Sequence, residues 1–196
     1  MSKLTVICNL TMDGVMQAPG HPDEDRRGGF TRGGWATPYS SDAMGRVMAD
    51  GTGGHAAMLF GRITYDRFAD YWPRQQDNPY TEMLNKTHKY VASTTLAEPL
   101  PWRNSSVLPG NAASSVAELK KNKPEQDLII LGSGALVRAL LPAGLIDEFK
   151  LLIHPLILGA GRRLFAEDGA AASFELIDSV GTTTGVVIGT YRPARS

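Results

Sequence analysis

The sequence predicts an α/β fold of three layers, in which a mixed, mainly parallel sheet carries helices on both faces. Three observations predict it. Short apolar runs alternate with segments of helical periodicity along most of the 196 residues. Runs such as Ala56–Phe60 lack polar alternation, which is typical of strands covered on both faces. The last two apolar runs, Phe174–Val180 and Val186–Tyr191, are separated by a short glycine-bounded segment, which favours an antiparallel hairpin.

The expected strands begin with Leu4–Leu10, which is rich in β-branched and apolar residues and is followed by the turn signal Asp13-Gly14. Asp127–Leu131 is the strongest central-strand signal in the chain. The other expected strands share a short apolar run that ends near glycine, proline or a hydroxyl residue. They are Ala56–Phe60, His88–Ser93, a brief strand at Val107, Phe149–Ile153, and the hairpin strands Phe174–Val180 and Val186–Tyr191.

The expected helices lie between these strands. Ser40, Ser41 or Asp42 can cap the first, which runs to about Gly51. The last carries leucines at helical spacing and is ended by Pro142 and Gly144. The others are expected over Ile63–Tyr71, Thr81–Lys86 and Ser114–Lys121.

The segment Gln17–Tyr39 is expected to be a long functional or mobile loop. It contains five glycines among charged residues and prolines, a composition that buries too little apolar surface to hold regular structure. Trp35 within it either lines a pocket under the loop or packs in the core.

Composition and charge limit the function classes. We expect one domain over residues 1–196, because this length suits a single core. Lysine plus arginine equals aspartate plus glutamate at 20 each, so no net field attracts a polyanion and nucleic acid is not an expected partner. No apolar stretch suits a membrane span and the first residues lack a signal-peptide core, so we expect a cytoplasmic protein.

Cysteine and histidine usage predicts no thiol or metal chemistry. Cys8 is the single cysteine, which excludes an internal disulfide, and its apolar surroundings predict a buried structural thiol. The histidines are scattered without ligand spacing, so no metal site is expected.

A glycine turn joins the strongest strand to the helix that follows it. Gly132-Ser133-Gly134 places backbone N–H groups and a helix dipole where they favour a phosphate, and Ser133 is expected to cap the helix and donate its hydroxyl. As a dinucleotide fingerprint the turn is incomplete, because Val137 holds the third glycine position, which disfavours a Rossmann domain. The glycines equally suit strand-to-helix geometry without a ligand.

Gly61-Arg62-Ile63-Thr64 repeats this arrangement after another apolar strand, with a cation and then a hydroxyl at the helix start. Ser93-Thr94-Thr95 adds hydroxyl donors after a third strand. Two such turns at one sheet edge can hold one extended phosphate ligand. The alternative is that Arg62 is a solvated surface residue and Thr64 a helix cap.

Six segments in a fixed order carry a family resemblance over nearly the whole chain. They are Thr11–Gly14, Leu59–Tyr65, Lys89–Leu96, Leu131–Gly134, Gly144–Glu148 and His154–Phe165. In this order they resemble the dihydrofolate reductase superfamily. The resemblance is closest to the C-terminal reductase domain of the bifunctional riboflavin-biosynthesis deaminase-reductase and its stand-alone relatives, and it implies a dihydrofolate reductase-like fold.

The resemblance implies that NADPH lies across the carboxyl ends of the strands. Arg62 would then favour NADPH over NADH by pairing with the extra phosphate. Ala135 stands where some relatives carry an arginine, so this preference depends on Arg62 and on Arg138. Implied contacts are Asn9 at the nicotinamide amide, Gly61, Arg62 and Thr64 at the adenosine phosphates, Ser93 and Thr94 beside them, and Gly132, Ser133, Gly134, Ala135, Leu136 and Val137 at the pyrophosphate.

The reaction implied by the family is hydride transfer to a polarised C=N or C=O, with a proton from a side chain or a held water. Asp42 is the best-placed acid on the helix after the long loop, or else a helix cap. Asp13 is either an active-site contact or a turn residue. The lack of a clear counterpart of the pterin-binding acid argues against dihydrofolate as the substrate.

A phosphorylated ribose ring is the alternative substrate, for which Arg162 and Arg163 or Arg26 and Arg27 would supply cations, unless these pairs are merely solvated. The zinc-site pattern of a deaminase is absent, so the reduction alone is expected. The resemblance also implies a homodimer paired through the later strands.

Three functions follow from these readings. The first is an NADPH-dependent reductase acting on a small heterocyclic or ribosylaminopyrimidine-like substrate, as 5-amino-6-(5-phosphoribosylamino)uracil reductase does. The second is an NADP-binding, non-catalytic dimeric module of the same fold. The third is a resistance or xenobiotic-reducing enzyme of loose specificity.

Overall fold

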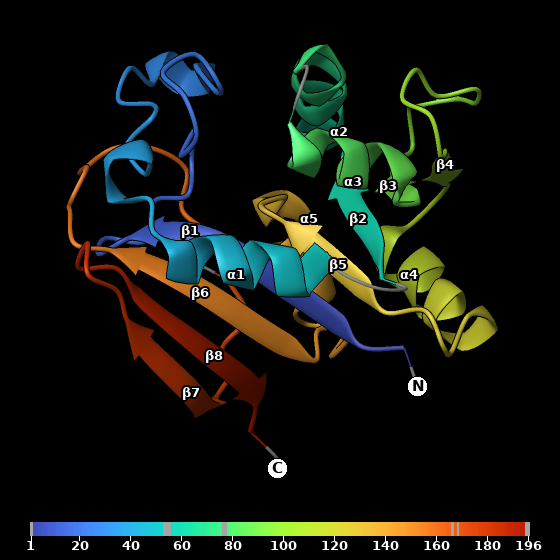
Figure 1. The fold of residues 1–196 in the computed structure, drawn as a ribbon. Coiled ribbons are helices and arrows are strands. Elements are labelled where there is room, and N and C mark those ends of the chain that lie inside the picture. The colour runs from blue at the N-terminus through green and yellow to red at the C-terminus, as the bar shows by residue number, and fades with distance from the viewer. Residues whose placement is uncertain (1, 53–55, 76–77, 166, 168, 195–196) are drawn as a thin grey trace.

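The computed structural model describes residues 2–52, 56–75, 78–165, 167 and 169–194. Its strands are β1 (Leu4–Thr11), β2 (Ala57–Gly61), β3 (Lys89–Ala92), β4 (Ser105–Leu108), β5 (Leu128–Leu131), β6 (Glu148–His154), β7 (Phe174–Gly181) and β8 (Val187–Pro193). They form one sheet in the order β4-β3-β2-β5-β1-β6-β8-β7 (Figure 1). Strands β1 to β6 are parallel, whereas β8 and β7 add an antiparallel hairpin. The predicted α/β fold is therefore confirmed.

The helices are α1 (Asp42–Thr52), α2 (Arg62–Tyr71), α3 (Pro79–Lys86), α4 (Ala112–Asn122) and α5 (Gly134–Leu140). Short 3-10 turns occur at η1 (Arg27–Gly29), η2 (Thr37–Tyr39) and η3 (Trp72–Arg74). Helices α3 and α4 begin two residues before the predicted starts. The reason is capping: Asn78 accepts from the Tyr80 N–H and Asn111 accepts from the Ser114 N–H.

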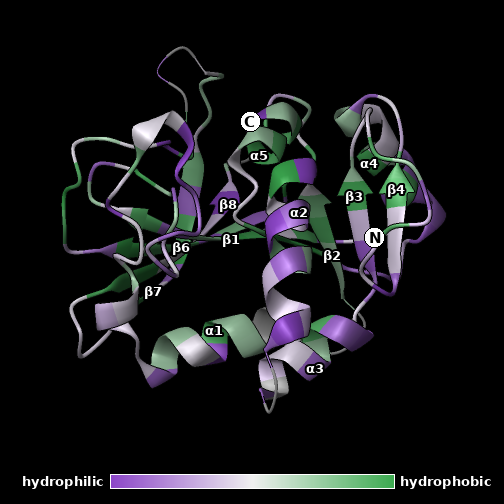
Figure 2. Cartoon of the chain, turned by 90° about the horizontal axis from the view of Figure 1, so that it is seen from above, coloured by the Kyte–Doolittle hydropathy of each residue, from purple (hydrophilic) through white to green (hydrophobic). Residues whose placement is uncertain are grey.

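Two apolar cores cover the two faces of the sheet. Alternate β1 residues, among them Leu4 and Val6, pack with residues of α4 and α5, whereas Ile7 points into the opposite core, which α1, α2 and α3 cover. Figure 2 shows the sheet edge-on between α5 and α4 on one side and α1 and α3 on the other. This is the three-layer arrangement that the sequence predicts. None of the helices in the described ranges is long and apolar enough to span a membrane.

Cys8 lies in the first of these cores, with 3% of its surface exposed. Burial raises the pKa of its thiol to about 12, because an apolar environment disfavours the thiolate. The predicted buried structural thiol is confirmed.

The loop 17–39 packs around a small core of its own. Phe30 and Trp35 are buried with Val15, Ala18 and Leu158, so this loop rests on the segment after β6. The indole Nε1 of Trp35 donates to the Gln17 carbonyl at 2.7 Å. Of the two fates predicted for Trp35, core packing is the one that the structure adopts.

Candidate functional site

The carboxyl ends of β3, β2, β5 and β1 are neighbours, because these parallel strands are adjacent in the sheet. The residues that follow them therefore meet at one edge, which is where ligands bind in open α/β sheets. The Gly61 N–H donates to the Ser133 hydroxyl at 3.1 Å, which links the end of β2 to the turn after β5. The prediction that the Ser133 side chain caps α5 is wrong, since its hydroxyl makes no capping bond.

Arg62 lies at this edge, at the first position of α2, with its guanidinium half exposed. Its Nη1 donates to the Thr95 hydroxyl at 2.6 Å, and its Nε donates to the Asp66 carboxylate at 3.4 Å. Ser93 shapes the same segment by accepting from the backbone N–H groups of Thr95 and Leu96. The structure thus brings Arg62 and the hydroxyl run after β3 together, with Thr95 rather than Thr94 as the partner of Arg62.

The glycine turn after β5 has a left-handed backbone, with φ of +64° at Gly132 and +50° at Ser133. Gly134 lies against the Met16 thioether: a Cβ on Gly134 would lie 2.5 Å from the Met16 sulfur, so the Met16 side chain would have to move to admit it. The Met16 side chain therefore covers the backbone of this turn, and Gly134 is buried beneath it.

Some residues predicted to contact the cofactor have buried side chains or polar groups that are already hydrogen-bonded. The side chains of Leu136 and Val137 belong to the apolar core, and the Val137 N–H donates to the Ser133 carbonyl at 3.0 Å. Thr64 lies within the first turn of α2 and is partly exposed. Arg138 donates through Nη1 to the carbonyls of Arg163 and Leu164, so that nitrogen is already used.

Asp13 is held by the turn that follows β1. Its carboxylate accepts from the Thr11 hydroxyl at 2.5 Å and from the backbone N–H groups of Leu158 and Gly159 at 3.2 and 2.8 Å. These hydrogen bonds, led by that of Thr11, lower the pKa of Asp13 below its ordinary value. An ionised, fully engaged carboxylate is a poor proton donor, so the geometry favours the turn interpretation.

Asp42 lies elsewhere, exposed in the first turn of α1. The backbone N–H of Met44 donates to the Ser41 hydroxyl at 3.4 Å, so Ser41 occupies the capping position. The structure therefore keeps the two predicted acids apart: Asp13 in the turn after β1 and Asp42 on the helix after the loop.

Asn9 pairs with a residue that the sequence did not single out. On the α1 face of the sheet, its Oδ1 accepts from His154 Nε2 at 3.0 Å. His154 is fully buried against Trp35 and Tyr39, with ring centroids at 5.1 and 5.5 Å, and its Nδ1 has no hydrogen-bond partner among the described residues. This desolvation lowers the pKa of His154 to about 4, so the ring is neutral at pH 7.

The buried neutral ring of His154 predicts a loss of stability in acid. Between about pH 6.5 and 4 the unfolded chain binds a proton at this imidazole that the folded protein does not, so unfolding becomes easier as the pH falls. The expected contribution is about 3 kcal/mol at most. Urea unfolding at pH 7.5 and 4.5 should show a smaller pH-dependent loss for His154→Gln than for the wild type. Equal pH-dependent losses of stability in the variant and the wild type would contradict the lowered pKa of His154 as their cause.

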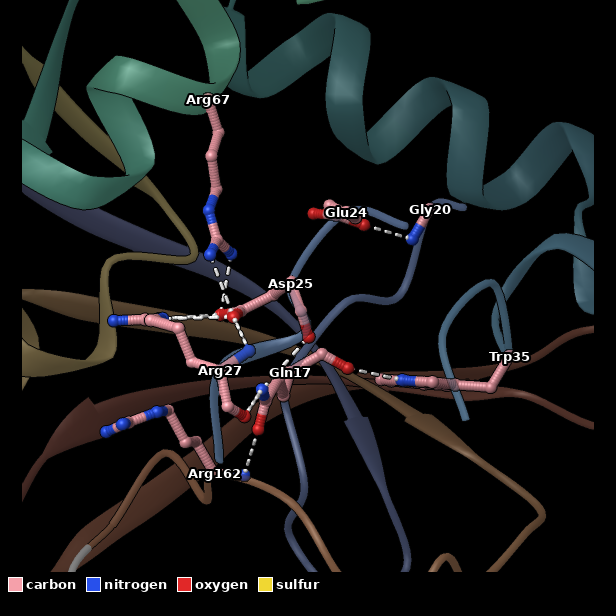
Figure 3. Close-up of polar contacts among 8 residues, drawn as sticks. All are labelled: Gln17, Gly20, Glu24, Asp25, Arg27, Trp35, Arg67 and Arg162. Carbon is pink, nitrogen blue, oxygen red and sulfur yellow. Dashed lines mark hydrogen bonds and ion pairs between the residues drawn. The ribbon is translucent and has the colours of Figure 1, made fainter. Parts of the chain in front are cut away.

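Loop 17–39 is fastened to both sides of the sheet edge (Figure 3). On one side, the Asp25 carboxylate accepts from Nη1 of Arg67 in α2 at 2.6 Å. On the same side, the ring of His21 stacks on that of Tyr71, with 5.2 Å between the ring centroids. On the other side Gln17 Oε1 accepts from the Arg162 N–H at 2.9 Å. The loop thus bridges α2 and the segment after β6.

Four residues of the site were not predicted as contacts, and the sequence offered a signal for only some of them. Asp25 and Arg67 are 42 positions apart, and neither belongs to a motif. His154 stands in a recognised segment, but its burial depends on Trp35 and Tyr39, which come from the distant loop. Thr95 belongs to the predicted hydroxyl run. That run follows β3 and Arg62 follows the neighbouring strand β2, which was the signal that the two could meet.

Comparison with known proteins adds a family and a fold. The family model of the RibD C-terminal domain matches residues 2–188. The uncharacterized protein YyaP of Bacillus subtilis (strain 168) is 32% identical over 136 residues, which cover 66% of this chain and 70% of YyaP. The family match extends from the start of β1 into β8 and includes the turns described above.

Two solved structures share the fold. A protein from Shewanella sp. PV-4 that carries a provisional riboflavin-biosynthesis name superposes with a TM-score of 0.74 at 23% identity, covering 98% of this chain and 99% of that one. A dihydrofolate reductase from Enterococcus faecalis, complexed with NADP(H) and RAB-propyl, superposes with a TM-score of 0.61 at 14% identity. The superposition covers 98% of this chain and 97% of that one. At these identities they show the fold alone, which is the predicted dihydrofolate reductase-like one.

Proposed function

The chain belongs to the RibD C-terminal domain family, and from that membership we propose that it is an NADPH-dependent reductase. Its substrate in this proposal is a small heterocycle of the ribosylaminopyrimidine type. The observation that carries the proposal is the strand-end edge where Arg62, Ser93, Thr95 and the glycine turn after β5 are gathered. The whole chain is one reductase domain, and the proposed location is the cytoplasm.

The chemistry of this edge fits a doubly phosphorylated carrier. Arg62 supplies an exposed guanidinium, whose planar fork suits a phosphate monoester such as the one that distinguishes NADPH from NADH. Gly132 and Gly134 bear no side chain, so a pyrophosphate reaches their backbone once the flexible Met16 side chain, which packs on both glycines, moves aside. The cofactor in the related-fold dihydrofolate reductase from Enterococcus faecalis is NADP(H), which supports the choice.

When bound, NADPH supplies a hydride for a C=N or C=O bond of the substrate. The residues of this chain hold and orient the reactants. Asn9 positions the nicotinamide amide from the α1 face, with its Oδ1 fixed by His154. Asp42 or a held water provides the proton that completes the two-electron reduction, since the oxygens of Asp13 are engaged by Thr11, Leu158 and Gly159.

The proposal is tested by titrating the protein with NADPH and NADH and then following the nicotinamide absorbance with candidate substrates. We expect NADPH to bind more tightly and to be oxidised with a ribosylaminopyrimidine phosphate, but not with dihydrofolate. Binding of NADPH without turnover on any ring substrate would favour the non-catalytic module. Turnover of simple quinones or imines alone would favour the enzyme of loose specificity.

A homodimer is part of this proposal. One of the two edge strands of the sheet is β7, in which Leu176, Ile177 and Val180 are 56, 45 and 43% exposed. An unpaired edge strand with apolar side chains suits a second copy of the chain. Sedimentation velocity should give a dimer for the wild type and a monomer for Leu176→Glu. A wild-type monomer at micromolar concentration would refute the pairing.

A further inference from the structure

His154 and Asn9 form a polar pair that joins two neighbouring strands at the strand-end edge. Asn9 lies near the end of β1, and His154 is the last residue of β6, the strand beside it. Asn9 comes two residues after Ile7, whose carbonyl accepts from the N–H of Gly132 in the turn after β5. Two residues along a strand span about 6.6 Å, so the pair lies beside the turn where the proposed cofactor binds.

The ring of His154 is held on two sides by residues that precede α1. It meets the rings of Trp35 and Tyr39 edge-on, at interplanar angles of 89 and 82°. These two residues are themselves fixed. The indole of Trp35 donates to a loop carbonyl, and the carbonyl of Tyr39 accepts from the Thr184 hydroxyl at 2.7 Å. The imidazole is therefore held in one orientation before a ligand binds.

The fixed ring favours one tautomer, because one of its nitrogens is buried without a partner. Nδ1 of His154 makes no hydrogen bond within the described part of the chain, and the residue is inaccessible to solvent. A proton on Nδ1 would place an unpaired N–H donor in this environment, and orphaned buried donors are rarer in folded proteins than acceptors without a partner. The proton therefore lies on Nε2, which makes Asn9 Oδ1 the acceptor of the 3.0 Å bond.

This bond fixes the amide of Asn9, whose two ends differ in chemistry. With its oxygen turned to His154, the amide presents its NH₂ group, which only donates. Nδ2 of Asn9 has no hydrogen-bond partner among the residues that the structure describes, and the residue is partly exposed. An asparagine without a fixed partner can present either end of its amide. The preference of this contact for an acceptor therefore comes from His154.

We infer that His154 is a positioning residue, which fixes the Asn9 amide so that Nδ2 donates to a carbonyl oxygen of the ligand. Under the proposed function, on which this inference rests, that oxygen belongs to the carboxamide of the nicotinamide ring. The carboxamide is attached to the ring carbon next to the one that releases the hydride. A fixed carboxamide therefore orients the reacting carbon, although His154 itself touches neither reactant.

A pair of oxidised carriers measures this contact. The thionicotinamide analogue of NADP⁺ replaces the carboxamide oxygen by sulfur, which accepts hydrogen bonds weakly. We expect the wild type to bind NADP⁺ about 3- to 10-fold more tightly than the analogue in fluorescence titrations, which is the contribution of one neutral hydrogen bond. In His154→Phe, which keeps an aromatic ring against Trp35 and Tyr39, this ratio should fall to about 1 because the amide is no longer fixed. His154→Gln should retain the ratio, because the glutamine Nε2 can donate to Asn9 Oδ1.

The ratio of the two affinities separates positioning from a structural role. A variant that merely loosens the fold binds both carriers less tightly and leaves their ratio unchanged. 2′-Phospho-ADP-ribose, which lacks the nicotinamide ring, should bind equally to the wild type and to His154→Phe. His88→Phe is the matched control, since the His88 ring also bonds to a side-chain hydroxyl and packs on an aromatic ring, but precedes β3 at the opposite end of the strands. Its ratio should equal that of the wild type.

The tautomer of His154 is measured without a cofactor by ¹⁵N NMR of the imidazoles, with the His154 signal assigned by its loss in His154→Gln. We expect the proton on Nε2, and a proton on Nδ1 would overturn the inference. Equal affinity of the wild type for the two carriers, or an equal change of the ratio in His154→Phe and His88→Phe, would also overturn it. If the wild type binds neither NADP⁺ nor 2′-phospho-ADP-ribose, the reductase proposal and the positioning role fail together. If both bind and His154→Phe keeps the wild-type ratio, only the role of His154 fails.

Discussion

Replacement of Arg62 by alanine is expected to weaken NADPH binding about 10- to 100-fold while changing NADH binding less than about 3-fold. A hydrogen bond to a charged partner contributes about 1.5–3 kcal/mol, and 1.4 kcal/mol corresponds to a tenfold change in affinity. Only NADPH carries the additional phosphate that the Arg62 guanidinium would bind. Fluorescence titration of wild type and variant with both cofactors measures the two ratios.

The structure offers a matched control for this experiment. Arg74 is exposed and pairs with Asp70, much as Arg62 pairs with Asp66, but it lies in η3, beyond the opposite end of α2. Arg74→Ala removes the same charge and should leave both affinities unchanged. Thr95→Val should weaken NADPH binding to a smaller extent, since Arg62 would lose the hydroxyl that orients it. Equal losses for both cofactors in Arg62→Ala would refute the contact with the extra phosphate.

The central layer of this fold is predictable because its signals are local. β5 and β2 are short apolar runs, and their residues are almost entirely buried. The glycines that follow them mark the turns correctly. The starts of α3 and α4 were placed too late because capping by Asn78 and Asn111 competes with apolar periodicity as a boundary signal, and the capping residues stand ahead of the periodic segment.

The contacts within the site depend on the order of the strands, which differs from their order in the chain. Ser133 bonds to Gly61 because β5 lies next to β2, with β3 and β4 on the outer side. Periodicity identifies strands but does not specify their neighbours, so the sequence suggested a helix cap for Ser133. The position of both segments directly after a strand predicted that Arg62 and the hydroxyl run share one sheet edge, and the family resemblance implied that both contact the cofactor there.

Loop 17–39 shows a second limit of local patterns. Its composition indicates irregular backbone, which is what the structure contains apart from short 3-10 turns. Composition does not reveal that Phe30 and Trp35 are buried with Leu158, or that Asp25 meets Arg67. These contacts are formed with residues far along the chain, so they follow only from the assembled fold.

Asp25 is expected to be the residue on which the position of this loop most depends. Its side chain is 6% exposed and accepts from Arg27 and from Arg67 of α2. Burial alone would raise the pKa of Asp25, but the hydrogen bonds from Arg27 and Arg67 outweigh it, so the pKa lies well below its usual range. The carboxylate therefore remains charged at neutral pH, and two guanidinium groups depend on it.

Asp25→Asn should lower the free energy of unfolding by about 2–4 kcal/mol at pH 7. Removing one partner of a buried ion pair costs about 3–5 kcal/mol, and the partly exposed guanidinium groups of Arg27 and Arg67 recover some of this by hydration. Because the folded pKa is lowered, the advantage of the wild type should be lost as the pH falls below about 4. Urea unfolding across this pH range measures both effects.

The matched variant is Asp23→Asn, which breaks the exposed pair with Arg26 in the same loop and should cost less than about 0.5 kcal/mol. Amide hydrogen exchange should accelerate through residues 20–30 in Asp25→Asn and stay unchanged in Asp23→Asn. A double-mutant cycle with Arg67→Gln isolates the contact to α2, and a coupling above about 1 kcal/mol is expected for it. If the two aspartate variants lost equal stability, or if the coupling with Arg67 were zero, the loop would not be held to α2 through Asp25.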